Sequence, residues 1–338
     1  MNIQIVHTLP EDVWRDFVYR NPTGNIFHTP EMFRVFEDAN KHQPTLWAAV
    51  NINQEVLALL LPVHVSLNDG LFRMLTTRAV VYGSVLWDSS DEGRNALSLL
   101  LREYSEETDD HAALFTELRN ITSVEDVKPI LQENGFVYES YLNYLIDLDC
   151  TPEIVFQNIG RRTRKNIRHG LNRGAVVIEE IKNLEQVEVC YNLLCKTYHE
   201  AQVPLADRSL FEGAFKRLYS QGMIKFTLAY VNEVPVATSV DLLYKDVIFG
   251  WYGGMDRSYS SYVPNELLMW HILEWGAKNG YCLYDFGGAG KPDEEYGVRE
   301  FKAKFGGALV SYGRHSRISN PLVFKVSKLG YNLYRRIL

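Results

Sequence analysis

The sequence predicts an α/β (α+β) protein of two related domains, each a mixed β-sheet flanked by helices. Its 338 residues are too many for one average domain, and a hydrophobic content of 46% supplies material for two cores. Strand-like and helix-like patterns alternate along the whole chain. Both halves also repeat one order of elements: a hairpin, a strand ending in Tyr-Gly, a helix, and a short strand with an acidic residue. That residue is Glu117 in the first half and Asp285 in the second.

In the first half, prolines and apolar alternation define the expected elements. Pro10 and Pro30 favour helix starts, because proline suits the first helical turn. The polar Asn53-Gln54-Glu55 between two apolar runs predicts a hairpin. The expected strands are 2–7, 45–52, 56–67, 79–87, 112–118 and 136–148, and the expected helices are 11–19, 30–39, 91–107 and 124–134.

Thr151-Pro152 marks the predicted boundary between a domain of residues 1–150 and a domain of residues 151–338. Threonine is a favoured N-cap and proline a favoured first helical residue, so a long basic helix is expected over 152–172. Asn232-Glu233 predicts the turn of a second hairpin. The other expected strands are 175–180, 224–231, 234–244, 247–252 and 281–286, and the other helices are 184–201, 207–220 and 264–279.

Composition argues against several classes of protein. The four cysteines form no CxxC pair, and no histidine cluster accompanies them, so neither a disulfide framework nor a structural metal is expected. The N-terminus lacks the basic start of a signal peptide, and the longest apolar run, 56–65, is half a membrane span. We expect a cytoplasmic protein, and no stable protein partner is implied.

The charge is divided unevenly along the chain, whose net charge is −7. Residues 1–150 hold 10 Lys and Arg against 23 Asp and Glu, whereas the remainder holds 25 against 19. Within the expected basic helix, Arg161, Arg164, Lys165 and Arg168 follow an i, i+3, i+4, i+7 spacing and share one face. Such a stripe suits the phosphates of a nucleotide-linked, lipid-linked or RNA substrate. Alternatively, it is a solvated face that pairs with the acidic first domain.

A glycine-rich stretch supplies the strongest candidate site. Tyr284–Gly290 reads as a strand that ends in glycines, which let backbone N–H groups approach a ligand. A loop and a short helix follow, and Lys302 lies near the end of that helix. The spacing matches neither a dinucleotide fingerprint nor a P-loop. The alternative interpretation is a tight connection without a ligand.

Four segments together resemble the Fem family of peptidoglycan-bridge aminoacyltransferases and the FemAB-like branch of GNAT acyltransferases. They are RRTRKNIRHGLNRG, WYGGMD, PNELLMWHILEWGAKNGY and, most specific, YDFGGAG…EEYGVREFKAKFGG. The likeness covers about residues 150–315 well, and Asn25–Phe33 and Tyr82–Trp87 support it in the first half. It implies two GNAT-like domains facing each other across a cleft. The length is similar to that of the compact FemX-type members.

The resemblance implies transfer of an acyl or aminoacyl group from an activated ester onto a primary amine of a cell-envelope precursor. No cofactor is expected to stay bound. The donor is either aminoacyl-tRNA or, alternatively, an acyl-CoA or acyl carrier used in envelope polysaccharide or lipid synthesis. Asp256–Asn265 stands where acetyltransferases hold the coenzyme A pyrophosphate with an [RQ]xxGx[GA] turn, so simple acetyl-CoA use is not expected. Net charge argues against a third class, a non-catalytic nucleic-acid-binding protein.

On this resemblance, Lys302 corresponds to the lysine of the family's FK motif and would meet the reacting centre, whereas Asp285 would orient the amine or the donor. The alternatives are a solvated surface lysine and a carboxylate that caps the next turn. Thr197 and His199 lie where the family tends to have Thr-x-Arg near the acceptor phosphate. The predicted substrate-binding residues are Arg161, Arg164, Lys165, Arg168, Thr197, His199, Tyr252, Gly287, Gly288 and Tyr296.

The C-terminal stretch Pro321–Leu338 interleaves apolar and basic residues. A basic amphipathic end of this kind would rest on the inner face of a membrane that carries a lipid-linked acceptor. Alternatively, it packs on its own domain with its charges outward.

Overall fold

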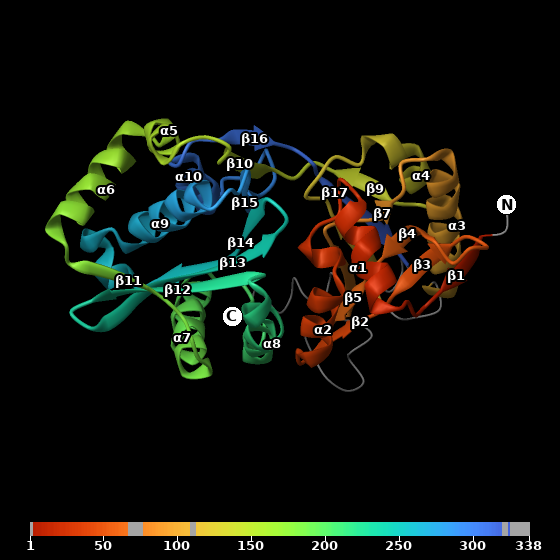
Figure 1. Ribbon diagram of the computed structural model, residues 1–338, viewed down its shortest axis with the longest axis horizontal. Helices are drawn as coiled ribbons and strands as arrows, with labels where there is room; N and C mark the ends of the chain where they lie inside the picture. The colour runs from red at the N-terminus through yellow and green to blue at the C-terminus, as the bar shows by residue number, and fades with distance from the viewer. Residues whose placement is uncertain (1–2, 67–76, 109–112, 320–323, 325–338) are drawn as a thin grey trace. The chain divides into compact units, whose positions relative to one another are not determined.

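The computed structural model describes residues 3–66, 77–108, 113–319 and 324, and its chain forms two compact units (Figure 1). The first unit contains Met1–Ser140 and Tyr312–Leu338, and the second contains Tyr141–Ser311. Each unit has its own sheets and its own apolar core. The predicted second domain was 151–338, whereas the second unit begins at Tyr141 and ends at Ser311.

The first unit contains two sheets. Their strand orders are β1-β3-β4-β7 and β2-β5-β6-β8-β17-β9. The strands are β1 (Gln4–Val6), β2 (His42–Pro44), β3 (Trp47–Val50), β4 (Val56–Leu60), β5 (Val63–Val65), β6 (Arg78–Tyr82), β7 (Leu86–Trp87), β8 (Phe115–Arg119), β9 (Val137–Glu139) and β17 (Arg314–Ile318). The helices are α1 (Glu11–Arg20), α2 (Pro30–Asp38), α3 (Asp91–Thr108) and α4 (Lys128–Glu133).

The predicted first hairpin forms, but its second strand is shorter than expected. β3 and β4 pair in antiparallel fashion from Trp47↔Leu60 to Val50↔Val56. Pro62 follows β4 and has no N–H to donate, so the run continues as β5 in the other sheet. Helix α3 packs on β3 and β4 and buries Leu97, Leu101 and Tyr104 against them (Figure 1).

The first-half segment that carried the family resemblance, Asn25–Phe33, forms a compact turn. Asn25 caps the 3₁₀ turn Ile26–His28 and accepts a hydrogen bond from Phe27 N, while Thr29 caps α2 through Met32 N. The ring of His28 contacts the carbonyl oxygen of Ser84 at 3.1 Å and is buried. Asn25 Nδ2 also donates to the Gly83 carbonyl oxygen at 3.3 Å, so hydrogen bonds join this segment to Tyr82–Trp87, the other first-half segment of the resemblance.

The second unit is one mixed sheet between two layers of helices. Its strand order is β11-β12-β13-β14-β15-β10-β16, with α9 packed on one face and α7 and α8 on the other (Figure 1). The strands are β10 (Asn143–Asp147), β11 (Val176–Glu180), β12 (Ile224–Val231), β13 (Val234–Tyr244), β14 (Val247–Met255), β15 (Leu283–Gly288) and β16 (Ala308–Val310). The helices are α5 (Pro152–Asn158), α6 (Arg161–Arg173), α7 (Leu184–Glu200), α8 (Arg208–Leu218), α9 (Pro264–Lys278) and α10 (Gly297–Ala303).

The predicted basic helix over 152–172 is two helices, α5 and α6. The chain leaves helical geometry at Ile159 and Gly160, where Gly160 N donates to the Lys304 carbonyl oxygen over 2.9 Å. A Cβ on Gly160 would approach that oxygen to 3.2 Å, which favours glycine at the contact. The predicted side-chain cap by Thr151 is absent from α5, although Pro152 does open the helix as expected.

The two units share one pattern of strand pairing, which confirms the predicted repeat. β6 and β8 pair in parallel in the first unit, and β14 and β15 do so in the second. The strand after each pair is antiparallel and comes from a distant part of the chain, β17 in the first unit and β10 in the second. The predicted strand over 136–148 therefore divides into β9 and β10, which belong to different units. This exchange moves the domain boundary, because pairing rather than sequence order decides which core a strand joins.

Most of the predicted C-terminal amphipathic segment lies outside the described residues. Phe324 is described, and its ring lies 5.8 Å from that of Phe115. Of the helices that the structure describes, none combines the length and the apolar character needed to cross a bilayer.

Candidate functional site

The sheet of the second unit opens between β14 and β15. Their parallel pairing runs from Val247↔Leu283 to Phe249↔Asp285, yet β14 continues to Met255 and β15 to Gly288. We call the segments Phe249–Met255 and Asp285–Gly288 the fork. Backbone groups of β14 on the side facing β15 lose their strand partner there, so they can hydrogen-bond to a ligand. A bulge at Trp251 accompanies the fork, since Val240 pairs with Tyr252 while Asp241 pairs with Gly250.

Lys302 reaches into one side of the fork from α10. Its side chain is buried, with 8% of the residue exposed. Nζ donates to the carbonyl oxygens of Phe286 at 2.6 Å, Gly288 at 2.8 Å and Gly287 at 3.4 Å. Burial lowers the pKa of the ammonium to about 8, although Asp285 acts to raise it. The alternative of a solvated surface lysine is therefore wrong.

Asp285 lies on β15 where the fork begins, with 3% of the residue exposed. Its Oδ1 accepts hydrogen bonds from Gly287 N at 2.7 Å and from Asn143 Nδ2 at 3.4 Å. Gly287 has φ +67°, a left-handed conformation that glycine adopts without strain. Burial raises the pKa of Asp285 to about 6, although the Gly287 N–H, Lys302 and Asn143 act to lower it. Asp285 therefore caps the turn and is also a carboxyl group that titrates near neutral pH.

Aromatic side chains line the α7 and α8 side of the fork. The ring of Tyr252 lies 4.8 Å from that of Phe211 on α8 and 5.9 Å from that of Tyr198 on α7. Burial raises the pKa of Tyr198 to about 12, and Tyr296 adds to the effect. Tyr296 precedes α10, and its ring lies against Gly290, where a Cβ would meet it at 3.0 Å. Tyr252 and Tyr296, two of the predicted substrate-binding residues, therefore lie near the aromatic side chains on the α7 and α8 side of the fork.

The predicted cation stripe lies on the exposed side of α6. Arg161, Lys165 and Arg168 are exposed, and Arg164 is half-buried and donates to the Gln157 carbonyl oxygen at 2.8 Å. Together with Arg162, which the spacing argument missed, the four line a shallow depression of about 760 Å³. The Arg168 guanidinium lies 5.1 Å from the ring centre of Phe156, so this cation is also held by packing. Among the described residues of this unit, no carboxylate forms an ion pair with these five cations.

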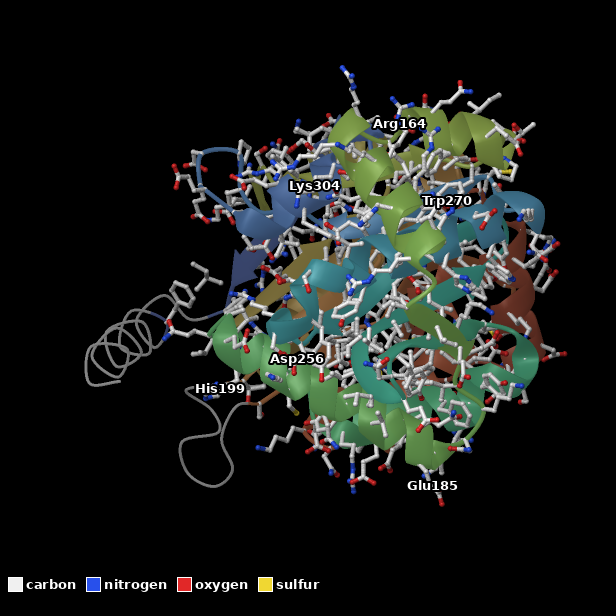
Figure 2. The ribbon with its side chains drawn as sticks, turned by 90° about the vertical axis from the view of Figure 1, so that its left-hand side faces the viewer. Arg164, Glu185, His199, Asp256, Trp270 and Lys304 are labelled. Atoms are coloured by element: carbon white, nitrogen blue, oxygen red, sulfur yellow. The ribbon has the colours of Figure 1, made fainter. Side chains whose placement is uncertain are left out.

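The predicted Thr197 and His199 do not join the cation stripe. Thr197 Oγ1 accepts from Met255 N at 2.9 Å and has the carbonyl oxygens of Leu193 and Met255 within 3.2 Å as acceptors for its one hydrogen, so it joins α7 to the end of β14. His199 is exposed near the end of α7. Figure 2 shows His199 and Arg164 on opposite sides of the unit. Helix α6 packs on α9, whereas α7 packs on the other face of the sheet, so one phosphate cannot contact both.

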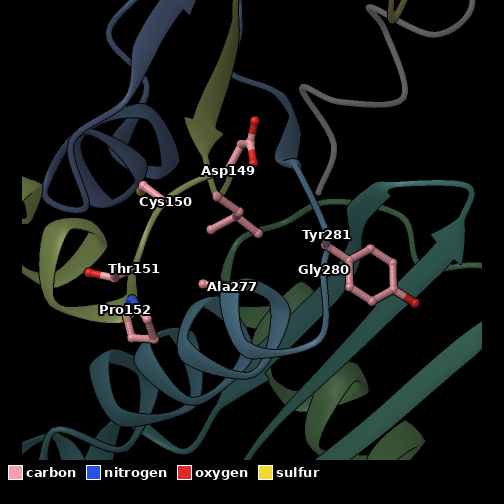
Figure 3. A pocket seen from close by; sticks show the side chains of 8 residues that line it. Asp149, Cys150, Thr151, Pro152, Ala277, Gly280 and Tyr281 are labelled. Atoms are coloured by element: carbon pink, nitrogen blue, oxygen red, sulfur yellow. The ribbon is translucent and has the colours of Figure 1, made fainter.

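A separate concavity of about 410 Å³ lies at the far end of the same strands (Figure 3). Asp149, Cys150 and Thr151 line one side of it, and Ala277, Gly280 and Tyr281 line the other. It adjoins the start of β15 at Leu283, whereas Asp285 and Lys302 lie toward the end of that strand. It is therefore not part of the fork. Within the described part of the chain, no cluster of three or more His, Cys, Asp or Glu side chains is arranged to hold a metal ion.

Sequence reasoning missed two parts of this site. Asn143 contacts Asp285 from β10, 142 residues away, and only the exchange of strands reveals that neighbour. Tyr284 and Asp241 are hydrogen-bonded across β14. Asp241 stands among apolar residues in the middle of β13, and this position could have indicated a buried acid with a partner.

Comparisons with known proteins agree with the resemblance seen in the sequence. An acetyltransferase (GNAT) domain family matches residues 158–302. Lipid II:glycine glycyltransferases from two strains of Staphylococcus epidermidis are 21% identical to the chain, and the match covers 59% of this chain and 66% of theirs. The match thus spans just under two thirds of the length of these curated relatives.

Solved structures show the same fold at low identity. The crystal structure of FemX has a TM-score of 0.74 and 16% identity, covering 96% of this chain and 99% of that one. A tandem GNAT protein from the clavulanic acid biosynthesis pathway has a TM-score of 0.57 and 12% identity, with coverage of 95% and 99%. The comparisons confirm the likeness to Fem-type proteins and the pair of GNAT-like units, and they support the predicted class of enzyme, an acyltransferase.

Proposed function

We propose that the chain is a Fem-type aminoacyltransferase, which moves an aminoacyl group from aminoacyl-tRNA onto a primary amine of a peptidoglycan precursor. The observation that carries the proposal is the fork, where Lys302 and Asp285 lie buried at the point at which β14 and β15 separate. The named relatives are lipid II glycyltransferases, and the FemX structure shares the fold over nearly the whole chain.

The start of α9 supports a donor other than coenzyme A. GNAT acetyltransferases bind the pyrophosphate of that cofactor at a helix start rich in N–H groups. Here α9 starts with Pro264, which has no N–H, and Glu266 adds negative charge in the first turn. Asp256, whose pKa falls to about 2 beside Lys196 and Ser258, caps the preceding turn. This helix start therefore lacks the first N–H group of such an anion site and carries a carboxylate in its first turn, both of which disfavour a pyrophosphate.

The proposed reaction exchanges one bond for another at the donor carbonyl carbon. The acceptor amine attacks this carbon, a C–N bond forms, and the ester C–O bond to the tRNA ribose breaks. Asp285 in its ionised form takes the amine proton, which finally resides on the departing ribose hydroxyl. The Lys302 ammonium stabilises the negative charge that develops on the carbonyl oxygen.

Lys302 must exchange one backbone partner to meet that oxygen. All three of its N–H groups are directed at carbonyl oxygens in this structure, and the bond to Gly287 is the longest at 3.4 Å. That bond is the weakest of the set, so we expect it to be replaced when a substrate binds. The other two contacts would keep the ammonium at the end of β15.

The cations of α6 would bind phosphates of the donor or of the precursor. Gly160, just before α6, donates a backbone hydrogen bond to Lys304 at the end of α10. The start of α6 therefore lies next to the helix that carries Lys302. Guanidinium groups bind phosphate oxygens in pairs, and their attraction weakens with salt. Action on a lipid-linked precursor would place the protein at the inner face of the membrane.

The test supplies purified protein with bulk tRNA charged with ¹⁴C-labelled amino acids and with lipid II in detergent micelles. We expect label to move onto lipid II, and we expect no consumption of ¹⁴C-acetyl-CoA under the same conditions. The GNAT domain match makes an acyl-CoA-dependent N-acyltransferase of envelope sugars or lipids the second candidate. Consumption of acetyl-CoA alone would establish that candidate and overturn the proposal.

A further inference from the structure

A buried hydrogen bond crosses the sheet of the second unit at the base of the fork. Tyr284 Oη donates to Asp241 Oδ1 over 2.9 Å, and the two residues are 3% and 1% exposed. Tyr284 lies on β15 and Asp241 on β13, so the bond spans the intervening strand β14. The other oxygen, Asp241 Oδ2, accepts from Ser239 Oγ at 3.0 Å. Both carboxylate oxygens have a donor, and two strands that are not neighbours are tied together.

The bond passes directly over Gly250. Gly250 is the register partner of Asp241, and a Cβ built on it would lie 2.4 Å from Tyr284 Oη. Real Cβ contacts do not reach that distance, so the phenol hydroxyl and any larger residue at position 250 exclude one another. The glycine is required here by the crossing side chain.

The hydrogen bond between Tyr284 and Asp241, which we call the tie, lies where the strand pairing changes on both sides of β14. Ile248↔Tyr284 is followed by the last parallel pair, Phe249↔Asp285, beyond which β14 and β15 separate. On the other side of β14, the register with β13 shifts between the partners of Val240 and Asp241. Side chains alternate along β15, so holding Tyr284 on one face orients Asp285 on the other.

We propose that Tyr284 and Asp241 are positioning residues, which set the separation of β14 from β15 at the fork and the direction of the Asp285 carboxylate. This inference rests on the proposed function for its catalytic consequence, since the fork is where the donor would bind. Its structural part concerns the free protein and is testable without any substrate.

The first experiment measures amide hydrogen exchange in residues 247–255 of the purified full chain. We expect Tyr284→Phe to speed exchange there by about 3- to 10-fold, the effect of losing one hydrogen bond. Asp241→Leu should do the same, whereas Asp241→Asn retains an acceptor for the phenol and should leave exchange near the wild-type rate. Tyr104→Phe is the matched control, because Tyr104 is buried and its hydroxyl is 2.8 Å from Thr116 Oγ1 in the first unit.

The second experiment is a double-mutant cycle between positions 250 and 284. Gly250→Ala should lower the melting temperature and speed exchange in 247–255, because the new methyl group meets the phenol hydroxyl. In Gly250→Ala with Tyr284→Phe the hydroxyl is gone, and the nearest ring carbon is 3.1 Å away. The double variant should therefore be more stable than Gly250→Ala alone. Additive losses would show that the two positions do not meet, and the proposal would fall.

The catalytic part is read from the pH dependence of kcat/KM with aminoacyl-tRNA. We expect Tyr284→Phe to lower kcat about tenfold and to move the acidic limb, while Tyr104→Phe changes neither. Burial raises the pKa of both Asp285 and Asp241 to about 6, and Asp241→Asn removes the second of these groups from the profile. Equal exchange and equal pH profiles in the two Tyr→Phe variants would show that the bond holds neither β14 nor the Asp285 carboxylate in place, and would overturn the inference. If wild-type protein consumes no donor, the proposed function fails, but the exchange and cycle experiments still decide the tie.

Discussion

Glu117 and Asp285 occupy equivalent strands in the two units, and their surroundings are opposite. Glu117 accepts from Arg119 Nε at 2.6 Å and from Arg314 Nη1 at 3.1 Å. Burial alone would raise its pKa, but the two guanidinium groups hold the pKa below the usual value. Asp285 is paired with no guanidinium among the described residues, and burial raises its pKa to about 6.

The parallel strand pairs that contain the two carboxylates also differ. β6 and β8 stay paired beyond Glu117, through Val81↔Leu118 to Tyr82↔Arg119. β14 and β15 stop pairing at Asp285. In the first unit, ion pairs neutralise Glu117 within a continuous sheet. In the second unit, Asp285 keeps a raised pKa at the point where the sheet opens. This difference indicates that the proposed chemistry belongs to the second unit.

The largest expected effect is at Lys302. Lys302→Ala should lower turnover by about 10²- to 10³-fold, the usual loss for one oxyanion donor, with a much smaller change in substrate affinity. Lys302→Arg should restore little, because a planar guanidinium cannot reproduce a compact ammonium that contacts three carbonyl groups. Steady-state kinetics with the donor and lipid II measure both variants.

Lys304 is the internal control for this prediction. It follows two residues later, its side chain is exposed, and its ammonium lies 5.6 Å from the ring centre of Phe301 (Figure 2). Lys304→Ala should retain near-normal turnover. Small and equal losses at positions 302 and 304 would remove Lys302 from the proposed mechanism.

The next effect is on stability, and it should have opposite signs in the two units. Asp285 has a raised pKa, so ionisation costs stability above pH 6, and Asp285→Asn should raise the melting temperature at pH 7.5. Glu117 has a lowered pKa, so Glu117→Gln should lower the melting temperature there. Each change is expected to be about 1–3 kcal/mol in the free energy of unfolding.

Thermal unfolding at several pH values checks both signs. The gain from Asp285→Asn should shrink as pH falls from 6 toward 4, where the carboxyl group is protonated in both states. The loss from Glu117→Gln should also shrink at low pH, as its ion pairs are lost. Asp285→Asn should abolish most turnover despite the gain in stability. A stabilised variant with full turnover would exclude Asp285 from the reaction.

The smallest expected effect is at the α6 depression. Arg161→Ala combined with Lys165→Ala should weaken binding of tRNA about tenfold at low salt, reduce the salt dependence of the binding constant, and barely change the melting temperature. These two cations are exposed, whereas Arg168 also packs on Phe156 and is less suitable.

The matched control removes two cations from α8, on the other face of the sheet: Arg208→Ala with Lys216→Ala. Fluorescence anisotropy with labelled tRNA compares the two double variants across a salt series. Equal weakening in both would mean that tRNA responds to net charge alone. Loss of folding in the α6 variant without a binding defect would instead assign those cations a structural role.

Several elements follow from the sequence because their cause is local. Val234–Tyr244 pairs with Ile224–Val231 around the predicted turn at Asn232-Glu233, both of whose residues adopt positive φ. Pro264 opens α9, and Gly297–Ala303 is the short helix expected to carry Lys302. Alternation, proline geometry and turn chemistry act within a few residues, so one chain segment contains the information.

The site required the tertiary structure. A lysine within a run of charged residues gives no sign that its ammonium meets three backbone carbonyl groups, and an aspartate at a strand end is equally able to cap a turn or to titrate. Long-range pairing brings Asn143 to Asp285 and Arg314 to Glu117, and these contacts join residues far apart in sequence. The same repeat thus produced a carboxyl group with a raised pKa in one unit and an ion pair in the other. Burial and neighbouring charge decide that difference, and both are properties of the folded chain.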